Sequence, residues 1–209
     1  MHRDDCACGP SRVPYYSQWE SPELVAQFID GSLRPADDPA WVGFGARTPQ
    51  EYEFWSTRAC GLACLKMILD WRDQPVPQTM RLVERGLAWR AYIRDGDSVA
   101  GLIYKPFADW VRHDFGIVAD VLPDLSLDVV SAVASPGTPV IASVHSSIRW
   151  PDRTPPQRGG HLVLVTGGAG GSLRLHNPSG IPGATQRDAV IGTADFARFF
   201  AGRGLVISE

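Results

Sequence analysis

A cysteine at the start of an apolar segment is the first residue whose position suggests chemistry. Cys60 is followed by Gly61 and then by LACLKMILDW, a run predicted to be helical. The first amides of a helix have no partner within the helix, and the helix dipole is positive there, so both favour a thiolate. A thiolate attacks carbonyl carbon, and the small Gly61 would let a substrate approach closely. The alternative is a buried, unreactive cysteine, the usual state of a free thiol.

Two polar residues in the second half of the chain could complete such a site. His161 opens an expected strand, and Asn177 ends the next one. The glycine-rich turn at 168–171 predicts a hairpin that brings these strand ends together. The Asn177 amide could then fix the tautomer and angle of the imidazole, so that its other nitrogen reaches the thiol. Alternatively, His161 is a structural strand-end histidine and Asn177-Pro178 a simple turn.

A glutamine upstream of the cysteine helix is the fourth candidate. The side-chain NH₂ group of Gln18 could donate to the oxyanion that develops when a carbonyl is attacked. The backbone N–H of Cys60 would be the second donor. In isolation, Gln18 is only a polar residue beside Trp19.

The first half of the chain reads as mainly helical. Ser21 and Thr48 begin two candidate helices, the second with a capping box and a proline at its first helical position. The Cys60 helix is too apolar for a surface helix, so we expect it to lie centrally. Two further amphipathic helices are expected over residues 79–89 and 104–115.

The second half changes to short apolar and β-branched runs. After a helix over LDVVSAVAS, strands are expected over PVIASV, HLVLVTG, SLRLHNP, DAVIG and LVIS, with TADFARFF helical before the last one. The prediction is an α+β protein in which N-terminal helices, with the nucleophile helix central, pack on a C-terminal antiparallel sheet. We expect a single domain over residues 13–209 and a flexible tail over residues 1–12.

The composition limits the class of protein. Of 209 residues, 44% are hydrophobic and 21% charged, which is ordinary for a globular protein. A net charge of −3 without a basic run argues against a nucleic-acid partner. No stretch approaches the roughly 18 consecutive apolar residues of a membrane span, and the N-terminus lacks the apolar core of a secretory signal. We therefore expect no membrane partner, and a cytoplasmic location if residue 1 is the true start.

Several other residues have simpler explanations than function. Four cysteines are too few for a disulfide scaffold, so free thiols are expected. Cys6 and Cys8 could hold a soft metal, but zinc needs four ligands in defined spacing, and no metal or cofactor is expected. Cys64 should pack in the core. His145 is a reserve site residue, and Trp150, in a proline-rich loop, could contact a substrate.

Six segments carry a resemblance to a known family. In order, VPYYSQW, ACGLACLKMILDW, PVIASV, GGHLVLVTG, LHNPSG and FARFF resemble the bacterial papain-like peptidases of family thirty-nine in the cysteine class. That family includes the double-glycine leader peptidases, and the likeness is closest to its stand-alone members. It spans about residues 13–207. It implies a papain-like fold with Cys60 as nucleophile, His161 as base, Asn177 as orienting residue and Gln18 as oxyanion donor.

The sequence departs from that family in three places. Leu62-Ala63-Cys64 stands where the family has proline and a small hydroxyl residue, and Asn177-Pro178 stands where it has Asp-Pro. Asparagine fills this role in papain-type peptidases, but loss of the carboxylate weakens stabilisation of an imidazolium. The stretch 30–58 is longer than in the family, and its aromatic residues predict either a lid or side wall of the substrate groove or an aromatic mini-core.

Three functions are open on the sequence alone. The first is a cysteine hydrolase that cleaves a peptide or related amide bond through an acyl-enzyme. The same Cys-His-Asn site could instead transfer the acyl group to another acceptor, or release a thioester-bound product in a biosynthetic pathway. The third is a catalytically weak peptide-binding domain, for which Asn177 is the hint. The partner is accordingly a peptide or acyl substrate, whose identity the sequence does not give.

Overall fold

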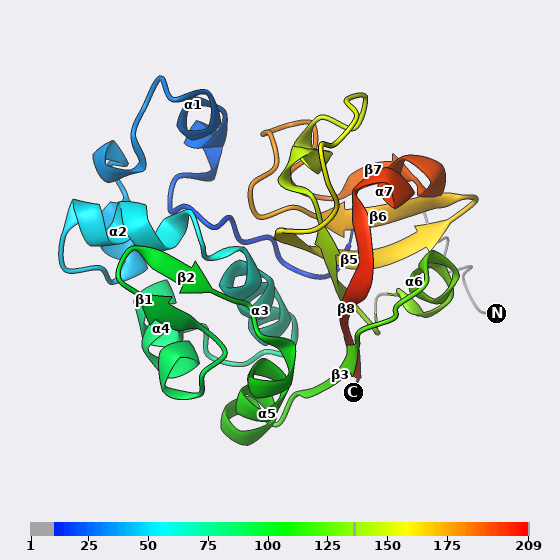
Figure 1. The fold of residues 1–209 in the computed structure, drawn as a ribbon, viewed down its shortest axis with the longest axis horizontal. Helices are drawn as coiled ribbons and strands as arrows, with labels where there is room; N and C mark the ends of the chain where they lie inside the picture. The colour runs from blue at the N-terminus through cyan, green and yellow to red at the C-terminus, as the bar shows by residue number, and fades with distance from the viewer. Residues whose placement is uncertain (1–10, 136, 209) are drawn as a thin grey trace.

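The computed structural model describes residues 11–135 and 137–208. Cys6, Cys8 and residues 1–10 of the expected tail therefore lie outside the described residues. Helices dominate the first half of the described chain, as the sequence predicts (Figure 1). The α-helices of this half are α1 (Val25–Asp30), α2 (Pro49–Ser56), α3 (Cys60–Trp71), α4 (Thr79–Ala88) and α5 (Tyr104–Phe115). We call residues 11–115 the helical half.

The helix-start signals in the helical half act only in part as expected. Ser21 precedes the 3-10 turn η1 (Pro22–Leu24) and makes no side-chain cap, and α1 begins only at Val25. The Thr48 side chain accepts a hydrogen bond from the Glu51 N–H, and Pro49 occupies the first turn of α2. The Glu51 carboxylate, however, accepts from the Arg47 N–H rather than completing the box at Thr48. A short hairpin of β1 (Ile93–Asp95) and β2 (Ser98–Ala100), which the sequence analysis did not predict, follows α4.

An antiparallel sheet forms the rest of the molecule, which we call the sheet half. Its six strands lie in the order β3-β8-β4-β5-β6-β7. Their bounds are β3 (Val118–Leu122), β4 (Val140–Val144), β5 (His161–Ala169), β6 (Ser172–His176), β7 (Ala189–Gly192) and β8 (Phe200–Ser208). Two helices accompany them, α6 (Leu127–Val133) and α7 (Thr193–Phe199). Helices packed against a large antiparallel sheet are the arrangement that the sequence predicts.

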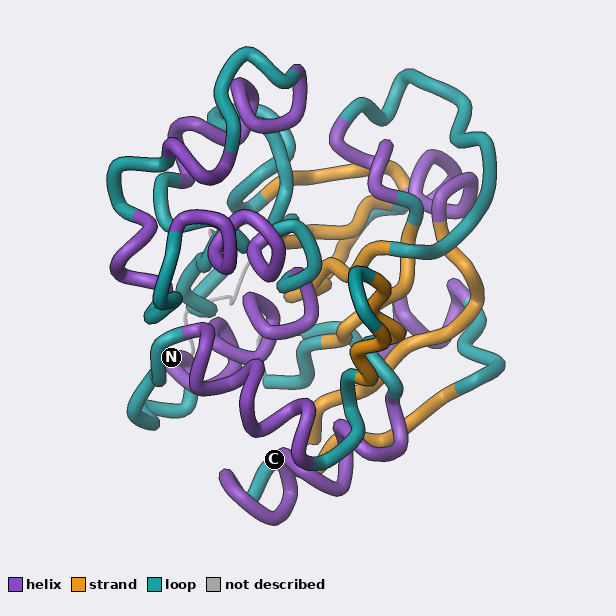
Figure 2. Tube along the Cα trace, turned by 60° about the vertical axis from the view of Figure 1, so that its left-hand side comes forward, coloured by secondary structure: helices purple, strands orange, loops and turns teal. Residues whose placement is uncertain are grey.

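The centre of the sheet is buried on both faces. Every residue of β4 is buried, and so are the first six of β5. Alternate residues therefore serve two apolar clusters, because successive side chains of a strand point to opposite faces. Ile141 and Leu164 pack with the residues of α3 and α5, whereas Val140 and Val163 pack with α6 and α7. Figure 2 shows the strands between the larger group of helices and the shorter ones.

Helix α3 lies centrally, as its composition predicts. All residues from Gly61 to Leu69 are buried, including Lys66. The Lys66 amine reaches the Thr79 hydroxyl and lies over the Tyr16 ring, so its charged end contacts polar and aromatic groups inside the helical half. A helix held on all sides fixes its first residue, Cys60, at one point in the fold.

The turn between β5 and β6 is a two-residue hairpin loop. Ala169 pairs with Ser172, which leaves Gly170 and Gly171 as the central residues, with φ angles of +60° and +79°. Positive φ at both central residues is the conformation that matches the twist of a hairpin and that glycine adopts without strain. The glycine-rich turn sets the register next to it, and an irregularity between Val165 and Gly167 shifts the pairing by one residue before the far ends of β5 and β6, where His161 and Asn177 lie.

The aromatic residues of the stretch 30–58 form the mini-core, and none of them lines the cleft described below. Phe44, Tyr52 and Trp55 are buried, and the Phe44 and Tyr52 rings meet edge to face with centroids 5.0 Å apart. The buried carboxylate of Asp38 accepts hydrogen bonds from the Tyr52 hydroxyl and the Ser21 hydroxyl and amide. Other residues of the same stretch line the cleft described below.

Candidate active site

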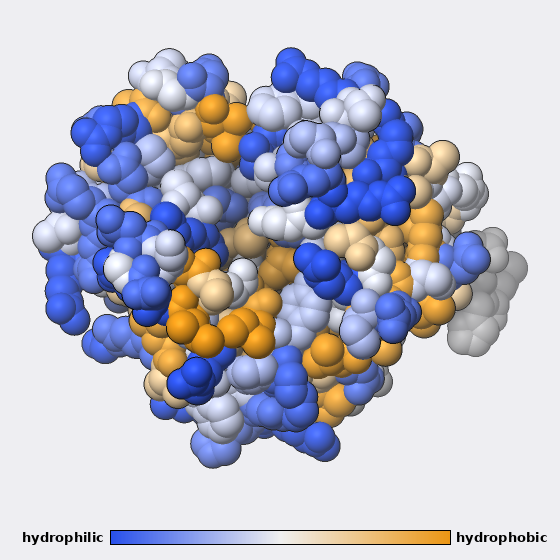
Figure 3. Space-filling view, in the orientation of Figure 1, coloured by the Kyte–Doolittle hydropathy of each residue, from blue (hydrophilic) through white to orange (hydrophobic). Residues whose placement is uncertain are grey.

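A cleft of about 550 Å³ lies where the helical half meets the sheet half. Figure 3 shows the surface hollowed between the upper parts of the two halves. Three of the four predicted site residues, Gln18, Cys60 and His161, line this cleft, and the fourth, Asn177, is bonded to His161. The fold therefore brings together residues that are far apart in the sequence.

Cys60 is the first residue of α3, and its sulfur faces backbone amides. The residue before it, Ala59, supplies no side-chain cap, so the first amides of the helix keep their donor capacity. The backbone N–H groups of Leu162, Gly61 and Cys60 itself lie near the sulfur and lower the pKa of the thiol. Because Leu162 follows His161 directly, the sulfur lies beside the peptide that joins those two residues.

Burial has the largest influence on the Cys60 thiol. Although part of the residue reaches the cleft surface, burial raises the pKa of Cys60 above its ordinary value. The three backbone donors act in the opposite direction, because they stabilise the thiolate. Without a ligand in the cleft, the neutral thiol is therefore the favoured form.

The imidazole of His161 is fixed by Asn177. The Nε2 atom lies 2.8 Å from Asn177 Oδ1, and the Ser179 N–H donates to the same oxygen at 3.1 Å. The backbone donor identifies that atom as oxygen, so Nε2 must carry the proton in this bond. Nδ1 is left with a lone pair, which is the state that a general base needs.

The pKa of His161 is lowered to about 4. Burial is the main cause, and the positive charge of Arg149 acts in the same direction. The hydrogen bond to Asn177 raises the pKa, but less than burial lowers it. Burial therefore favours the neutral forms of both His161 and Cys60 in the cleft, rather than an imidazolium and a thiolate.

The Gln18 side chain is buried at the wall of the cleft. Its Nε2 donates to the Ser56 carbonyl at 2.9 Å, which leaves the second proton of that amide available. The Gln18 N–H donates to the Pro178 carbonyl, so the segment before α1 is docked on the loop that follows Asn177. In Figure 1 this segment crosses from the helical half to the sheet.

Unsatisfied polar atoms gather around this cleft. Within the described part of the chain, Gln18 Oε1, Trp19 Nε1 and Tyr92 Oη are buried without a hydrogen-bond partner, and all three residues line the cleft. Asn177 Nδ2, behind His161, is also unsatisfied. Buried polar groups normally find partners, so such a concentration marks a place where water or a ligand completes the bonding.

Three residues near the site escaped the sequence analysis. Tyr92 enters the cleft from the turn after α4, and Arg149 enters it from the 3-10 turn η4 (Ser146–Arg149). Ser179 is buried, and its hydroxyl lies 3.1 Å from His161 Nε2. A polar residue next to Asn177-Pro178 was the available signal for Ser179, whereas no pattern marks the other two.

The remaining predictions about single residues have mixed outcomes. Cys64 is fully buried in the core, as expected. The reserve candidate His145 caps η4 and contacts the Ser147 hydroxyl, so it lies close to the cleft without lining it. Trp150 also does not line the cleft; its ring lies against the guanidinium groups of Arg149 and Arg153.

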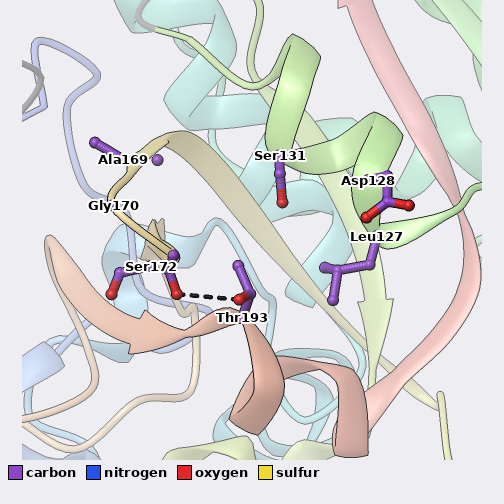
Figure 4. Close-up of a pocket in the computed structure, with 9 residues that line it drawn as sticks. Leu127, Asp128, Ser131, Ala169, Gly170, Ser172 and Thr193 are labelled. Carbon is purple, nitrogen blue, oxygen red and sulfur yellow. Dashed lines mark hydrogen bonds between the residues drawn. The ribbon is translucent and has the colours of Figure 1, made fainter.

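A second cavity lies at the opposite end of the β5–β6 hairpin. It has a volume of about 310 Å³, and Figure 4 shows Asp128 and Ser131 of α6 facing the hairpin turn. The Thr193 hydroxyl donates to the Gly171 carbonyl there, at 3.0 Å. This cavity contains no thiol or imidazole, so we do not assign chemistry to it.

The described residues were searched for metal sites and for membrane-spanning helices. Across residues 11–135 and 137–208, no group of three His, Cys, Asp or Glu side chains is arranged to hold a metal ion. Over the same residues, no helix has the length and apolar character needed to cross a bilayer.

A scan against protein-family models finds no match, and no curated protein matches the sequence.

The lowered pKa of His161 predicts a stability loss in mild acid. Between pH 6.5, the ordinary value, and about 4, the unfolded imidazole binds a proton that the folded one rejects. Protons therefore favour unfolding in this window, and the free energy of unfolding should fall by about 3 kcal/mol as the pH drops through it. Urea unfolding midpoints measured across the window test this expectation.

A His161→Asn variant supplies the comparison. The fall in the free energy of unfolding that His161 contributes between pH 6.5 and about 4 should be absent in this variant. The slope due to His176 should remain, because burial lowers the pKa of that residue in the same direction. An unchanged slope in the variant would show that His161 is not buried as a neutral group.

Proposed function

We propose that this chain is a papain-like cysteine hydrolase that cleaves a peptide or related amide bond through an acyl-enzyme. The supporting observation is that Cys60 and His161 line one cleft, where the Asn177 amide holds the His161 ring at 2.8 Å. A nucleophile, a base with a free nitrogen and an orienting amide thus meet at one cleft. The resemblance noted in the sequence implies the same three roles.

The geometry supports the following steps. His161 Nδ1 takes the proton of the Cys60 thiol as sulfur attacks the substrate carbonyl carbon. The oxyanion accepts hydrogen bonds from the Cys60 N–H and the second proton of Gln18 Nε2. The imidazolium then protonates the leaving amine, and the carbon–nitrogen bond breaks to give a thioester. Water, deprotonated at Nδ1, attacks the thioester, and the thiol regains its proton.

A second candidate function has one observation in its favour. Burial raises the pKa of Cys60 and lowers that of His161, so charge separation between them is disfavoured in the ligand-free cleft. A catalytically weak peptide-binding domain would have this property. A hydrolase with a neutral resting pair would instead form the thiolate only when a substrate is bound.

Thiol labelling tests the proposed site without knowledge of the substrate. Iodoacetamide near neutral pH should label Cys60 well ahead of the buried Cys64, and mass spectrometry of proteolytic peptides identifies the labelled residue. His161→Ala should slow the labelling of Cys60 by about tenfold or more, because the general base is lost. Labelling confined to Cys6 and Cys8 would refute the proposed nucleophile.

The pH dependence of the same reaction separates the two candidates. A base-assisted thiol gives a rate that depends on His161 at every pH at which the imidazole is neutral. A rate that is the same with and without His161, and that rises only with alkaline ionisation of the thiol, would favour the binding domain over the hydrolase.

A further inference from the structure

We propose that Arg149 binds a carboxylate on the leaving group of the substrate, so that the preferred substrates release an amine that carries a nearby carboxylate. This inference rests on the proposed function, because it takes Cys60 and His161 as the reacting pair. The shared chemistry is an anionic oxygen pair close to the scissile amide. It can be the free carboxylate at the end of a chain or the side chain of an acidic residue.

Arg149 is positioned next to the candidate base by Ser179. Its Nε donates to the Ser179 carbonyl at 3.1 Å, and its Nη2 donates to the Ser179 hydroxyl. That hydroxyl lies 3.1 Å from His161 Nε2. The guanidinium is thus separated from the imidazole by one side chain, and Arg149 also lines the cleft. It is held rigidly enough to act as a fixed binding point.

The positive charge of Arg149 has no counterion among the residues that the structure describes. Both of its hydrogen-bond acceptors belong to the neutral Ser179, and no ion pair involves it. Its Nη1 has no hydrogen-bond partner within those residues. Burial lowers the pKa of Arg149 to about 10, which still leaves the group charged at neutral pH. A half-buried charge without a counterion is costly, and a bound carboxylate would remove that cost.

The rest of the cleft favours an anion as well. Glu53 lines the cleft, but Arg34 holds its carboxylate at 2.7 Å. Arg58 also lines the cleft, and its guanidinium donates to backbone carbonyls and to the Thr57 hydroxyl, not to a carboxylate. The uncompensated charges around the cleft are therefore positive, although the whole chain has a net charge of −3.

The location of Arg149 indicates which part of the substrate it meets. In the proposed reaction the imidazole delivers its proton to the leaving amine, so groups beside the imidazole lie on the leaving-group side of the scissile bond. Arg149 lines the same cleft as His161 and is linked to it through the Ser179 hydroxyl. A carboxylate a few bonds beyond the scissile nitrogen would meet its free Nη1.

Matched alkylating reagents test this inference. N-iodoacetylglycine carries a carboxylate at about the spacing of a leaving amino acid, and N-iodoacetylglycinamide is its neutral counterpart. In both, the Cys60 sulfur displaces iodide. The ratio of the acid rate to the amide rate should be about fivefold higher for folded protein than for the same chain unfolded in urea. High salt should reduce this preference. The N-iodoacetyl derivative of aspartic acid α-amide shows whether a side-chain carboxylate is accepted too.

Two variants and one control locate the effect. Arg149→Met should bring the ratio down to that of the unfolded chain, whereas Arg149→Lys should keep part of it. Arg153→Met is the matched control, because Arg153 lies over the same Trp150 ring, 4.8 Å from its centroid, but does not line the cleft. The rate with the neutral amide reports on folding and on thiol reactivity in each variant.

The outcomes separate this inference from the proposed function. If Cys60 reacts with acid and amide in the ratio seen for the unfolded chain, or if the ratio does not respond to salt, Arg149 does not bind a carboxylate and the hydrolase proposal stands. If Cys60 reacts with neither reagent faster than the unfolded chain does, the proposed function itself fails. A preference that Arg153→Met abolishes as completely as Arg149→Met would also overturn the assignment to Arg149.

Discussion

A Cys60→Ser variant is expected to lose on the order of 10⁴-fold or more of the peptide-cleaving activity and to keep its fold. The hydroxyl is close to the thiol in size, so the start of α3 should be undisturbed. Its proton, however, is much less acidic than that of a thiol. With its pKa lowered to about 4, His161 is too weak a base to activate an alcohol. Mass spectrometry of products from a mixed-sequence peptide library measures the loss, and urea unfolding measures stability.

Cys64→Ala is the matched control for this loss. Cys64 lies one turn further along α3 and is fully buried, so it cannot meet a substrate. The variant should lose a modest amount of stability, about 1 kcal/mol, and keep a rate close to that of the unchanged protein. If Cys64→Ala lost as much activity as Cys60→Ser at equal stability, the nucleophile would have been assigned wrongly.

The parts of the fold that the sequence predicts are those that local rules determine. Helix α3 can be recognised as a central helix in the sequence, because a run as apolar as LACLKMIL is stable only when other parts of the protein surround it. The β5–β6 hairpin can be predicted from Gly170 and Gly171, because glycine adopts two successive positive φ angles without strain. This turn brings the strand ends with His161 and Asn177 side by side, but the face on which each side chain lies also depends on the register shift between Val165 and Gly167, which the sequence does not reveal. The nearness of the central pair of the candidate site was therefore within reach of sequence reasoning.

The parts that the sequence does not predict depend on partners distant in the chain. Strand β3 lies at the edge of the sheet and has no buried residue, so its sequence shows no clear alternation of apolar and polar residues. It is a strand because Val118 to Leu122 pair with β8. The last strand is expected from the sequence to begin at Leu205, but β8 begins at Phe200, because Phe200 already pairs with Val144 of β4. Helix α7 therefore ends at Phe199, one residue earlier than its sequence pattern predicts.

The same limit applies to the candidate site. Arg149 and Ser179 meet only because the loop before β5 folds over the loop after β6. Their contact changes the expected role of Asn177, which in the sequence is only the loss of a carboxylate. Asn177 Oδ1 and Arg149 share the Ser179 hydroxyl. A carboxylate at position 177 would compensate the arginine from within the protein, whereas the amide leaves that charge available to a ligand.

A Gly180→Ala variant is expected to lose about 3 kcal/mol or more of its free energy of unfolding. Gly180 closes the turn after Asn177, with its N–H donating to the Asn177 carbonyl at 2.9 Å. A Cβ atom there would lie 2.2 Å from the Thr185 carbonyl oxygen and 2.5 Å from Gln186 Cα. Both neighbours are backbone atoms, so no side chain can rotate away and the turn itself must move. Because the same turn carries Asn177 and Ser179, the rate of Cys60 alkylation should fall as well.

Gly167→Ala separates this clash from the general effect of removing a glycine. Gly167 lies in β5, has no positive φ, and an added Cβ would meet nothing within 4 Å. The free energy of unfolding of the Gly167→Ala variant should differ from that of the unchanged protein by no more than about 0.5 kcal/mol, and the rate of Cys60 alkylation should be unaffected. Urea midpoints of the two variants, measured side by side, give the comparison. Equal stability of the two would mean that the 177–180 turn has room to adjust, and that the chain at 185–186 does not hold Asn177 against His161.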